Sequence, residues 1–110
     1  MKQGDIIKLV LDPVRGHEQS GFRPAVVVSN NDYNALTGNR IVCPVTNTEK
    51  AYLTHVALAG KCATTGFVMC DQVRLIDVTA AERKAVYVES LPVETLYSIL
   101  AIVTDLFSVR

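Results

Sequence analysis

The chain has 110 residues, 49% of them hydrophobic, and its 11 Lys and Arg residues balance its 11 Asp and Glu residues. This length suits a single domain (1–110), because a division would leave each part too small a core. The zero formal net charge argues against a long basic nucleic-acid surface, but it is compatible with a small site where a few cations converge.

The cysteines and apolar runs indicate the compartment. Cys43, Cys62 and Cys70 make an odd number without C-x-x-C spacing, and no cationic, apolar leader precedes the first predicted strand. We therefore expect reduced thiols in a cytoplasmic protein. The longest apolar run, Leu96–Val103, falls well short of the roughly 20 residues of a membrane-spanning helix, so no membrane span is predicted.

Most of the chain reads as short strands separated by turns. Alternating or β-branched residues predict strands over residues 4–12, 23–30, 40–46, 53–60, 64–77 and 84–91. Pro24 must lie at a strand start or on an edge, and Pro44 interrupts its strand. One helical turn fits between Asp32 and Leu36 and is stopped by Gly38. In the longest strand, Gly66 or the Asp71–Gln72 step is a candidate bulge.

From Pro92 the hydrophobic period becomes helical. Leu96, Leu100, Val103 and Phe107 share one face, and further apolar residues widen it beyond half of the circumference. Such a wide face suggests burial on two sides, by the domain and by a second subunit; the alternative is a helix enclosed in its own core. Short strands and one terminal helix together predict a mostly β fold, a small antiparallel barrel with the helix packed on it.

Several motifs together resemble one family. They are "LDPVRGHEQSGFRPAVVVSN", "VCPVTN" and "TTGFVMCDQVRLID", in this order along nearly the whole chain. The combination resembles the MazF/PemK/Kid toxins of bacterial toxin–antitoxin pairs, and most of all the Kid/PemK branch. The resemblance implies an SH3-like barrel of the plasmid-partition toxin type that forms homodimers. It also implies metal-independent, sequence-specific cleavage of single-stranded RNA, and a cognate antitoxin that covers the RNA groove.

Metal-free RNA cleavage needs a base for the 2′-hydroxyl proton, an acid for the departing 5′-oxygen, and donors for the phosphorane charge. The products would be a 2′,3′-cyclic phosphate and a 5′-hydroxyl. Arg23 suits the phosphorane, because its fork of donors matches a charged phosphate. The resemblance places the catalytic arginine here and a functional threonine at Thr46. A surface arginine and an ordinary strand threonine are the alternatives.

The glycine-bounded loop before Arg23 holds three polar candidates. His17 titrates near neutrality, and in the Kid-like branch the matching histidine is proposed to assist cleavage or bind RNA. Glu18 is a candidate to accept hydrogen bonds from a base edge or to hold Arg23, and Gln19 to contact a base. The alternative for all three is a solvated loop.

Asp71 interrupts an apolar strand, and its counterpart in the Kid-like branch is a proposed general base. An ionised carboxylate there needs a partner or a rim position, and Arg74 is the candidate partner. In the Kid-like branch an arginine stands two positions earlier, where this chain has Met69; this puts the Asp–Arg form of the mechanism in doubt and favours Arg23 with Thr46, assisted by His17. MazF-like members also lack that arginine, so its replacement does not argue against nuclease activity. We expect RNA contacts from Glu18, Gln19, Asn47, Gln72 and Arg74.

Other polar residues give weaker signals. His55 is expected to be a structural strand residue, because the histidines and cysteines lack zinc-ligand spacings, and no metal or cofactor is expected. Cys70 has no obvious histidine partner and is a poor catalytic thiol. The competing functions are a non-catalytic binding module, like the gyrase-poisoning toxins that share the fold, and an inactive relative retained for antitoxin binding.

Overall fold

An N-terminal hairpin begins the sheet in this computed structural model, which describes residues 1–12, 21–48 and 52–110. Strand β1 (Asp5–Val10) pairs antiparallel with β2 (Phe22–Val27), and Leu9 lies opposite Arg23. Pro24 lies opposite Lys8, one residue before β2 begins to pair with the next strand at Ala25. At Pro24, β2 is paired on one side only, so the absence of a backbone N–H is tolerated there, as the sequence predicted for an edge position.

The predicted helical turn is helix α1 (Asn31–Leu36). The Asn30 side chain caps it by accepting a hydrogen bond from the backbone N–H of Tyr33 at 2.9 Å. The helix leads into β3 (Asn39–Thr46), which pairs with β2 along residues 42–44.

The predicted long strand 64–77 is wrong in one respect: it is two strands, β5 (Phe67–Met69) and β6 (Arg74–Asp77), separated by a turn at residues 70–73. Both pair with β3, β6 along residues 39–42 and β5 along residues 45–46. Pro44 lies between the β3–β6 and β3–β5 ladders, so the absence of its backbone N–H removes no hydrogen bond from either of them. The break that the sequence suggested at Asp71–Gln72 is thus larger than a bulge.

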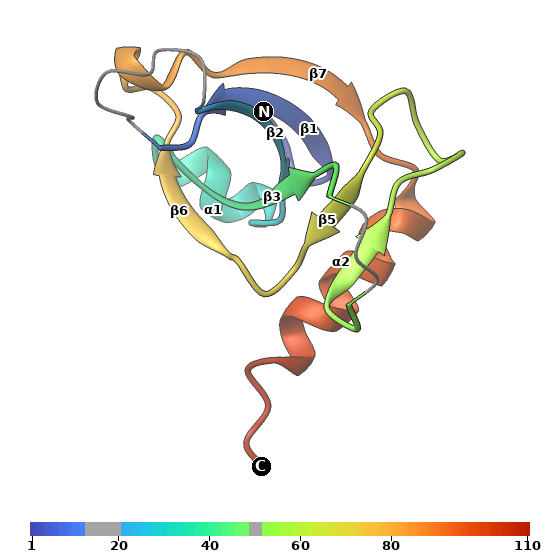
Figure 1. The fold of residues 1–110 in the computed structure, drawn as a ribbon. Helices are drawn as coiled ribbons and strands as arrows, with labels where there is room; N and C mark the ends of the chain where they lie inside the picture. The colour runs from blue at the N-terminus through green and yellow to red at the C-terminus, as the bar shows by residue number, and fades with distance from the viewer. Residues whose placement is uncertain (13–20, 49–51) are drawn as a thin grey trace.

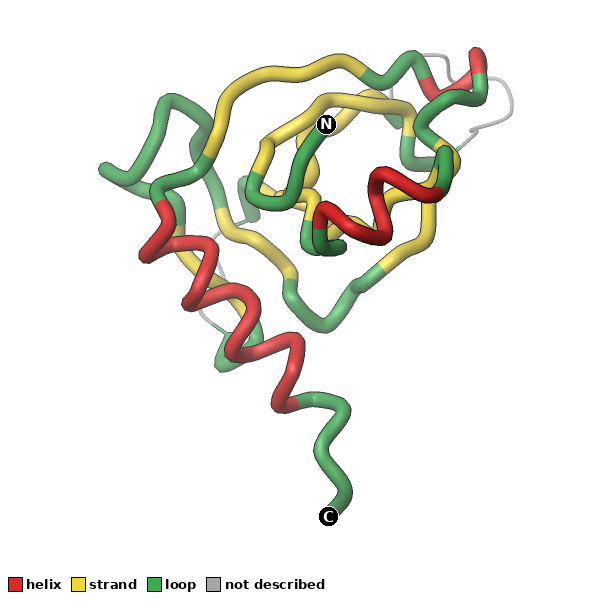
Figure 2. Tube along the Cα trace, turned by 180° about the vertical axis from the view of Figure 1, so that it is seen from behind, coloured by secondary structure: helices red, strands yellow, loops and turns green. Residues whose placement is uncertain are grey.

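The remaining elements complete one bent sheet. Strand β4 (His55–Ala57) pairs with β5, and β7 (Val86–Ser90) follows the 3-10 helix η1 (Ala81–Arg83) and pairs with β1. The strand order is β4-β5-β3-β2-β1-β7, with β6 beside β3, and every pair is antiparallel. Figures 1 and 2 show the strands curling round strongly, with the C-terminus projecting away. The predicted mostly β antiparallel fold with a C-terminal helix is confirmed.

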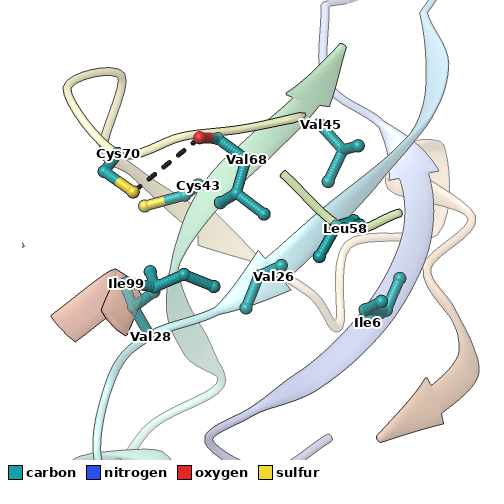
Figure 3. Close-up of a cluster of buried hydrophobic side chains, with 9 residues drawn as sticks. All are labelled: Ile6, Val26, Val28, Cys43, Val45, Leu58, Val68, Cys70 and Ile99. Carbon is teal, nitrogen blue, oxygen red and sulfur yellow. Dashed lines mark hydrogen bonds between the residues drawn. The ribbon is translucent and has the colours of Figure 1, made fainter. Parts of the chain in front are cut away.

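Both faces of the hairpin are buried. One cluster, drawn in Figure 3, brings side chains of β1, β2, β3 and β5 together with Leu58 and with Ile99 of the terminal helix. The other cluster contains Ile7 and Leu9 of β1 together with Val42 and Ile76. Alternate residues of one strand point to opposite faces, so β1 contributes to both clusters.

The terminal helix α2 (Val93–Asp105) lies against this sheet along one side only. Thr95 and Ile99 are buried, whereas Tyr97 is 66% exposed and Phe107, just beyond the helix, is 74% exposed. The alternative of a helix enclosed in its own core is therefore wrong. Among the helices of the described residues, none is long and apolar enough to cross a membrane.

Candidate functional site

Arg23 is held at the start of β2. It lies opposite Leu9 in the hairpin and its side chain is exposed. The chain enters β2 through Gly21, whose carbonyl accepts a hydrogen bond from the backbone N–H of Leu11 at 2.9 Å. A Cβ on residue 21 would lie 2.4 Å from the carbonyl oxygen of Asp12, so only glycine permits this approach. The guanidinium is thereby rooted on a regular strand rather than on a loop.

Thr46 lies at the end of β3, opposite Phe67 of β5, and is partly buried. Its hydroxyl oxygen accepts a hydrogen bond from the backbone N–H of Thr48 at 3.2 Å, which leaves the hydroxyl proton available for donation. The strand end rests against Gly66, which has a φ of +110°.

A small cleft brings Arg23 and Thr46 together, although they come from different strands. Its volume is about 170 Å³, and its other lining residues are Leu11, Asp12, Pro44, Val45, Met69, Gln72 and Arg74. A guanidinium and a hydroxyl thus face one solvent-accessible space. The sequence predicted this pair as the groups that bind the phosphate, and that role stays a prediction.

A larger cavity of about 610 Å³ adjoins the cleft. It is lined by Thr46, Thr48, Tyr52, Leu53, Thr54, His55, Met69, Asp71 and Gln72. Thr46, Met69 and Gln72 line both spaces, so cleft and cavity form one groove across the ends of β3 and β5.

The structure places Asp71 in the turn after β5, exposed and lining the larger cavity rather than the cleft. The expected pairing with Arg74 is wrong. The guanidinium of Arg74 instead donates to the Asp12 carboxylate at 2.9 Å and to the Leu11 carbonyl at 2.9 Å. The turn at residues 70–73 separates Asp71 from β6, so a rim position, not a salt bridge to Arg74, keeps the carboxylate hydrated.

Arg74 and Arg83 act together beside the cleft. Arg83 donates to the same Leu11 carbonyl at 2.7 Å and to the Val10 carbonyl at 3.0 Å. Two guanidiniums therefore fix the end of β1, where the chain enters the connection to β2. Asp12, which lines the cleft, is held there as a consequence.

Asn47 lines a different cavity from Thr46, the residue that precedes it in the chain. It lines a third cavity of about 380 Å³ together with Lys8 and Glu89, and its side-chain oxygen accepts a hydrogen bond from the Thr65 hydroxyl at 3.2 Å. Gln72, in contrast, lines both parts of the groove. His17, Glu18 and Gln19 lie outside the described residues.

Sequence reasoning did not identify His55 and Tyr52 as site residues. The His55 side chain lines the larger cavity, and its ring lies edge-on to that of Tyr52, with centroids 4.9 Å apart. A three-residue strand such as β4 is too short for alternation to show which side chains face inward. The one available signal was composition: a histidine and a tyrosine beside an otherwise irregular loop.

The buried thiols have raised pKa values and are poor nucleophiles. Burial raises the pKa of Cys43 to about 12, and the neighbouring Cys70 and Asp71 add to that rise. Burial likewise raises the pKa of Cys70 to about 11. All three cysteines are free, as expected, and within the described parts of the chain no three potential metal ligands converge. Neither buried thiol is suited to act as a nucleophile.

Known proteins share both this sequence and this fold. The chain is 42% identical to the endoribonuclease PemK of Escherichia coli over 84 residues, 73% of the chain and 63% of PemK. It is also 42% identical to the endoribonuclease toxin MazF of E. coli strain K12 over 73 residues, 66% of the chain and 65% of MazF. The chain therefore spans slightly under two thirds of each of these relatives.

A crystal structure of MazE–MazF from Deinococcus radiodurans superposes with a TM-score of 0.80 at 27% identity, covering 100% of this chain and 97% of the other. Residues 2–107 match the family described as "PemK-like, MazF-like toxin of type II toxin-antitoxin system". By sequence and by fold, the chain belongs to the PemK/MazF family of type II toxins.

Proposed function

We propose that this protein is a metal-independent, sequence-specific endoribonuclease toxin that cleaves single-stranded RNA. The observation that carries the proposal is the cleft shared by Arg23 and Thr46. Family membership supports it, because the E. coli relatives PemK and MazF are named endoribonucleases. The bent sheet serves in this proposal as an SH3-like barrel that holds the two residues on rigid strands.

In the proposed reaction the ribose 2′-oxygen attacks the adjacent phosphorus and the bond to the 5′-oxygen breaks. The guanidinium of Arg23 stabilises the charge that develops on the phosphorane, and the Thr46 hydroxyl donates to one of its oxygens. Asp71 and His17 are the two titratable groups proposed for moving the proton from the 2′-oxygen and returning one to the 5′-oxygen. The products are a 2′,3′-cyclic phosphate and a 5′-hydroxyl.

Two partners complete the proposal. One is a second copy of the chain, packed against the exposed side of α2, where Tyr97 and Phe107 leave apolar surface in water. The other is a cognate antitoxin that covers the groove, by analogy with the MazE–MazF complex. Light scattering of the purified protein tests the first, since a dimer is expected at micromolar concentration and Tyr97→Glu should shift it to monomer.

The central experiment incubates the purified protein with a mixed RNA in excess chelator and maps the new 5′ ends. Discrete cuts that carry 5′-hydroxyls are expected, and a single 2′-deoxy substitution at a cut site should abolish that cut. Arg23→Ala should lower the rate by about 100-fold to 1,000-fold, while Lys61→Ala, an exposed cation outside the groove, should leave it unchanged. Intact RNA would favour the non-catalytic binding module or the inactive relative; Met69, in place of the arginine of the Kid-like branch, is the sequence feature that points to the inactive relative.

A further inference from the structure

The end of strand β1 is held by an arginine that lies outside the groove. Arg83, the last residue of η1, donates through Nη1 to the carbonyl oxygens of Leu11 at 2.7 Å and Val10 at 3.0 Å. It lies 72 positions from Leu11 in the chain. Arg83 itself lines neither the cleft nor the larger cavity. Any influence of Arg83 on the groove must therefore pass through the backbone that it binds.

The backbone around η1 keeps Arg83 beside β1. The next residue, Lys84, has a φ of +50°, the one positive φ of a non-glycine residue within the described ranges. Its backbone N–H donates to the carbonyl of Ala81 at 3.2 Å and closes the short helix. Residues with a side chain adopt this conformation at a cost, and such strain persists where the surrounding structure imposes it. The strained turn leads directly into β7, which pairs with β1.

Leu11 connects Arg83 to the strand that carries Arg23. Its carbonyl accepts from Arg83, and its backbone N–H donates to the carbonyl of Gly21 at 2.9 Å. Its side chain is buried in the core and also lines the cleft. Gly21 packs closely on the carbonyl of Asp12, and it precedes Arg23 by two positions. A shift of Leu11 would therefore reach the start of β2 through one hydrogen bond and one close backbone contact.

The proposed reaction makes the position of Arg23 critical. A guanidinium stabilises a phosphorane only when its donors meet the charged oxygens, and a misplacement of about 1 Å can slow a reaction about 100-fold. We infer that Arg83 is a positioning residue of the nuclease site. By holding the Leu11 carbonyl, Arg83 fixes Arg23 in the geometry that the transition state requires, without touching the RNA. This inference rests on the proposed function.

The kinetics of Arg83→Gln test the inference in the whole protein. This change shortens the side chain and removes the guanidinium from the Leu11 carbonyl. With a defined RNA oligonucleotide, kcat should fall about tenfold, because the disturbed interaction is one made with the transition state. KM should change by less than about twofold. Arg83→Lys keeps a charged donor for one carbonyl and should restore part of the lost kcat.

Arg40 is the matched control. It is also half-buried, and its guanidinium likewise binds backbone carbonyls, those of Met1 at 2.9 Å and Asn39 at 2.8 Å. It stands near the start of β3, whereas Thr46 ends that strand. Arg40→Gln should therefore lower the urea midpoint of unfolding much as Arg83→Gln does, but it should leave kcat unchanged.

A double-mutant cycle separates positioning from a general loss of structure. If Arg83 acts through Arg23, then Arg83→Gln should have no further effect on the residual cleavage rate of Arg23→Ala. A role in stability alone would instead lower the rate by the same factor in both backgrounds.

The link between the two arginines can also be followed by NMR without RNA. In Arg83→Gln, the Leu11 amide hydrogen should exchange with solvent about tenfold faster than in the wild type. The amide resonances of Gly21 and Arg23 should shift at the same time. Arg40→Gln should change neither the exchange rate nor these resonances.

The outcomes distinguish this inference from the proposed function. If the wild-type protein cuts RNA but Arg83→Gln keeps its kcat, or loses the same factor in Arg23→Ala, the inference is overturned and the nuclease proposal stands. If no RNA is cut but Arg83→Gln shifts the Gly21 and Arg23 resonances, the link between Arg83 and Arg23 is supported and the proposed function fails. Unshifted resonances overturn the inference in either case.

Discussion

Gly66 lies directly against the backbone of Thr46: a Cβ on residue 66 would stand 2.5 Å from the Thr46 carbonyl oxygen and 2.9 Å from the Asn47 side-chain oxygen. Its φ of +110° is also one that residues with a side chain rarely adopt. Residue 66 thus determines where the end of β3 lies, and with it the position of Thr46, which lines the cleft together with Arg23.

Gly66→Ala should therefore lower both stability and activity. We expect the free energy of unfolding to fall by about 3 kcal/mol, from backbone strain and the clash together, and RNA cleavage to fall because Thr46 is displaced. Gly60→Ala is the control, since Gly60 has a φ of +75° but no atoms within 4 Å of an added Cβ. Equal unfolding midpoints in urea and equal cleavage rates for the two variants would contradict this account.

Glu89 of β7 anchors the loop before Gly66. Its carboxylate accepts hydrogen bonds from the backbone N–H groups of Ala63 (3.1 Å) and Thr64 (2.7 Å) and from the Thr64 hydroxyl (2.6 Å). The hydrogen bond from the Thr64 hydroxyl contributes most to lowering the pKa of this carboxyl below its usual value. The stability that these hydrogen bonds give the folded protein is fully present at pH values above 4.5, the ordinary pKa of a glutamate. It is lost as the pH falls through the lowered pKa of Glu89 in the folded state.

In Glu89→Gln one acceptor becomes a donor that faces other donors. The amide hydrogens of Ala63 and Thr64 should then exchange with solvent about tenfold faster at pH 7. Hydrogen exchange measured by NMR checks this, with Glu82→Gln on η1 as the control. Unchanged protection of these two amides in Glu89→Gln would show that the loop is held by other contacts.

The buried thiols predict a loss of stability in alkali. Folded Cys43 stays protonated up to about pH 12, whereas an unfolded thiol ionises near its ordinary value of 9.0. Between these values the unfolded state binds fewer protons, so stability falls as pH rises, by up to about 1.4 kcal/mol per pH unit for each such thiol. Urea unfolding from pH 8 to pH 11 measures the slope.

Cys43→Ala should flatten that slope more than Cys62→Ala does, because Cys62 is only partly buried although its pKa is also raised. Figure 3 shows Cys43 beside Cys70, whose Sγ lies 3.8 Å from the Val68 carbonyl oxygen. Identical slopes for the two alanine variants would mean that other groups cause the alkaline loss.

Arg74 allows a test of structural against RNA-binding roles. Its guanidinium already binds Asp12 and the Leu11 carbonyl, and its side chain is 33% exposed. We expect Arg74→Gln to destabilise the protein by about 1 kcal/mol and to leave the salt dependence of RNA binding unchanged. If the slope of the logarithm of the RNA-binding constant against the logarithm of the salt concentration falls in magnitude by about 1, Arg74 contacts a phosphate directly, as the sequence suggested.

The sequence predicted the strands whose residues alternate or are β-branched, because burial of a sheet face imposes that pattern. It failed at residues 64–77, where the apolar run continues through a turn. The reason is visible in β3, which exchanges one neighbour for another at Pro44. The composition of a segment does not indicate which strand it will pair with.

The same limit applies to the groove. Arg23 and Thr46 were assigned through resemblance, since neither residue is unusual for its strand. The ion pair between Asp12 and Arg74 joins residues 62 positions apart, a separation that no local motif encodes. His55 was predicted to be structural because the histidines and cysteines lack zinc-ligand spacings; the pairing of β4 with β5 places it opposite Met69, and its ring lies against Tyr52.

The pairing of β1 with β7, which sets Asp5 opposite Ser90, has a consequence for synthesis of the protein on the ribosome. All described residues of the groove have been translated by Arg74, yet the strand that leads to Asp12 still lacks one neighbour, and Ile99 of the core has not been made. Such long-range contacts form late. The nascent chain therefore carries every described residue of the groove well before it carries a folded groove, and an incomplete translation product would be inert.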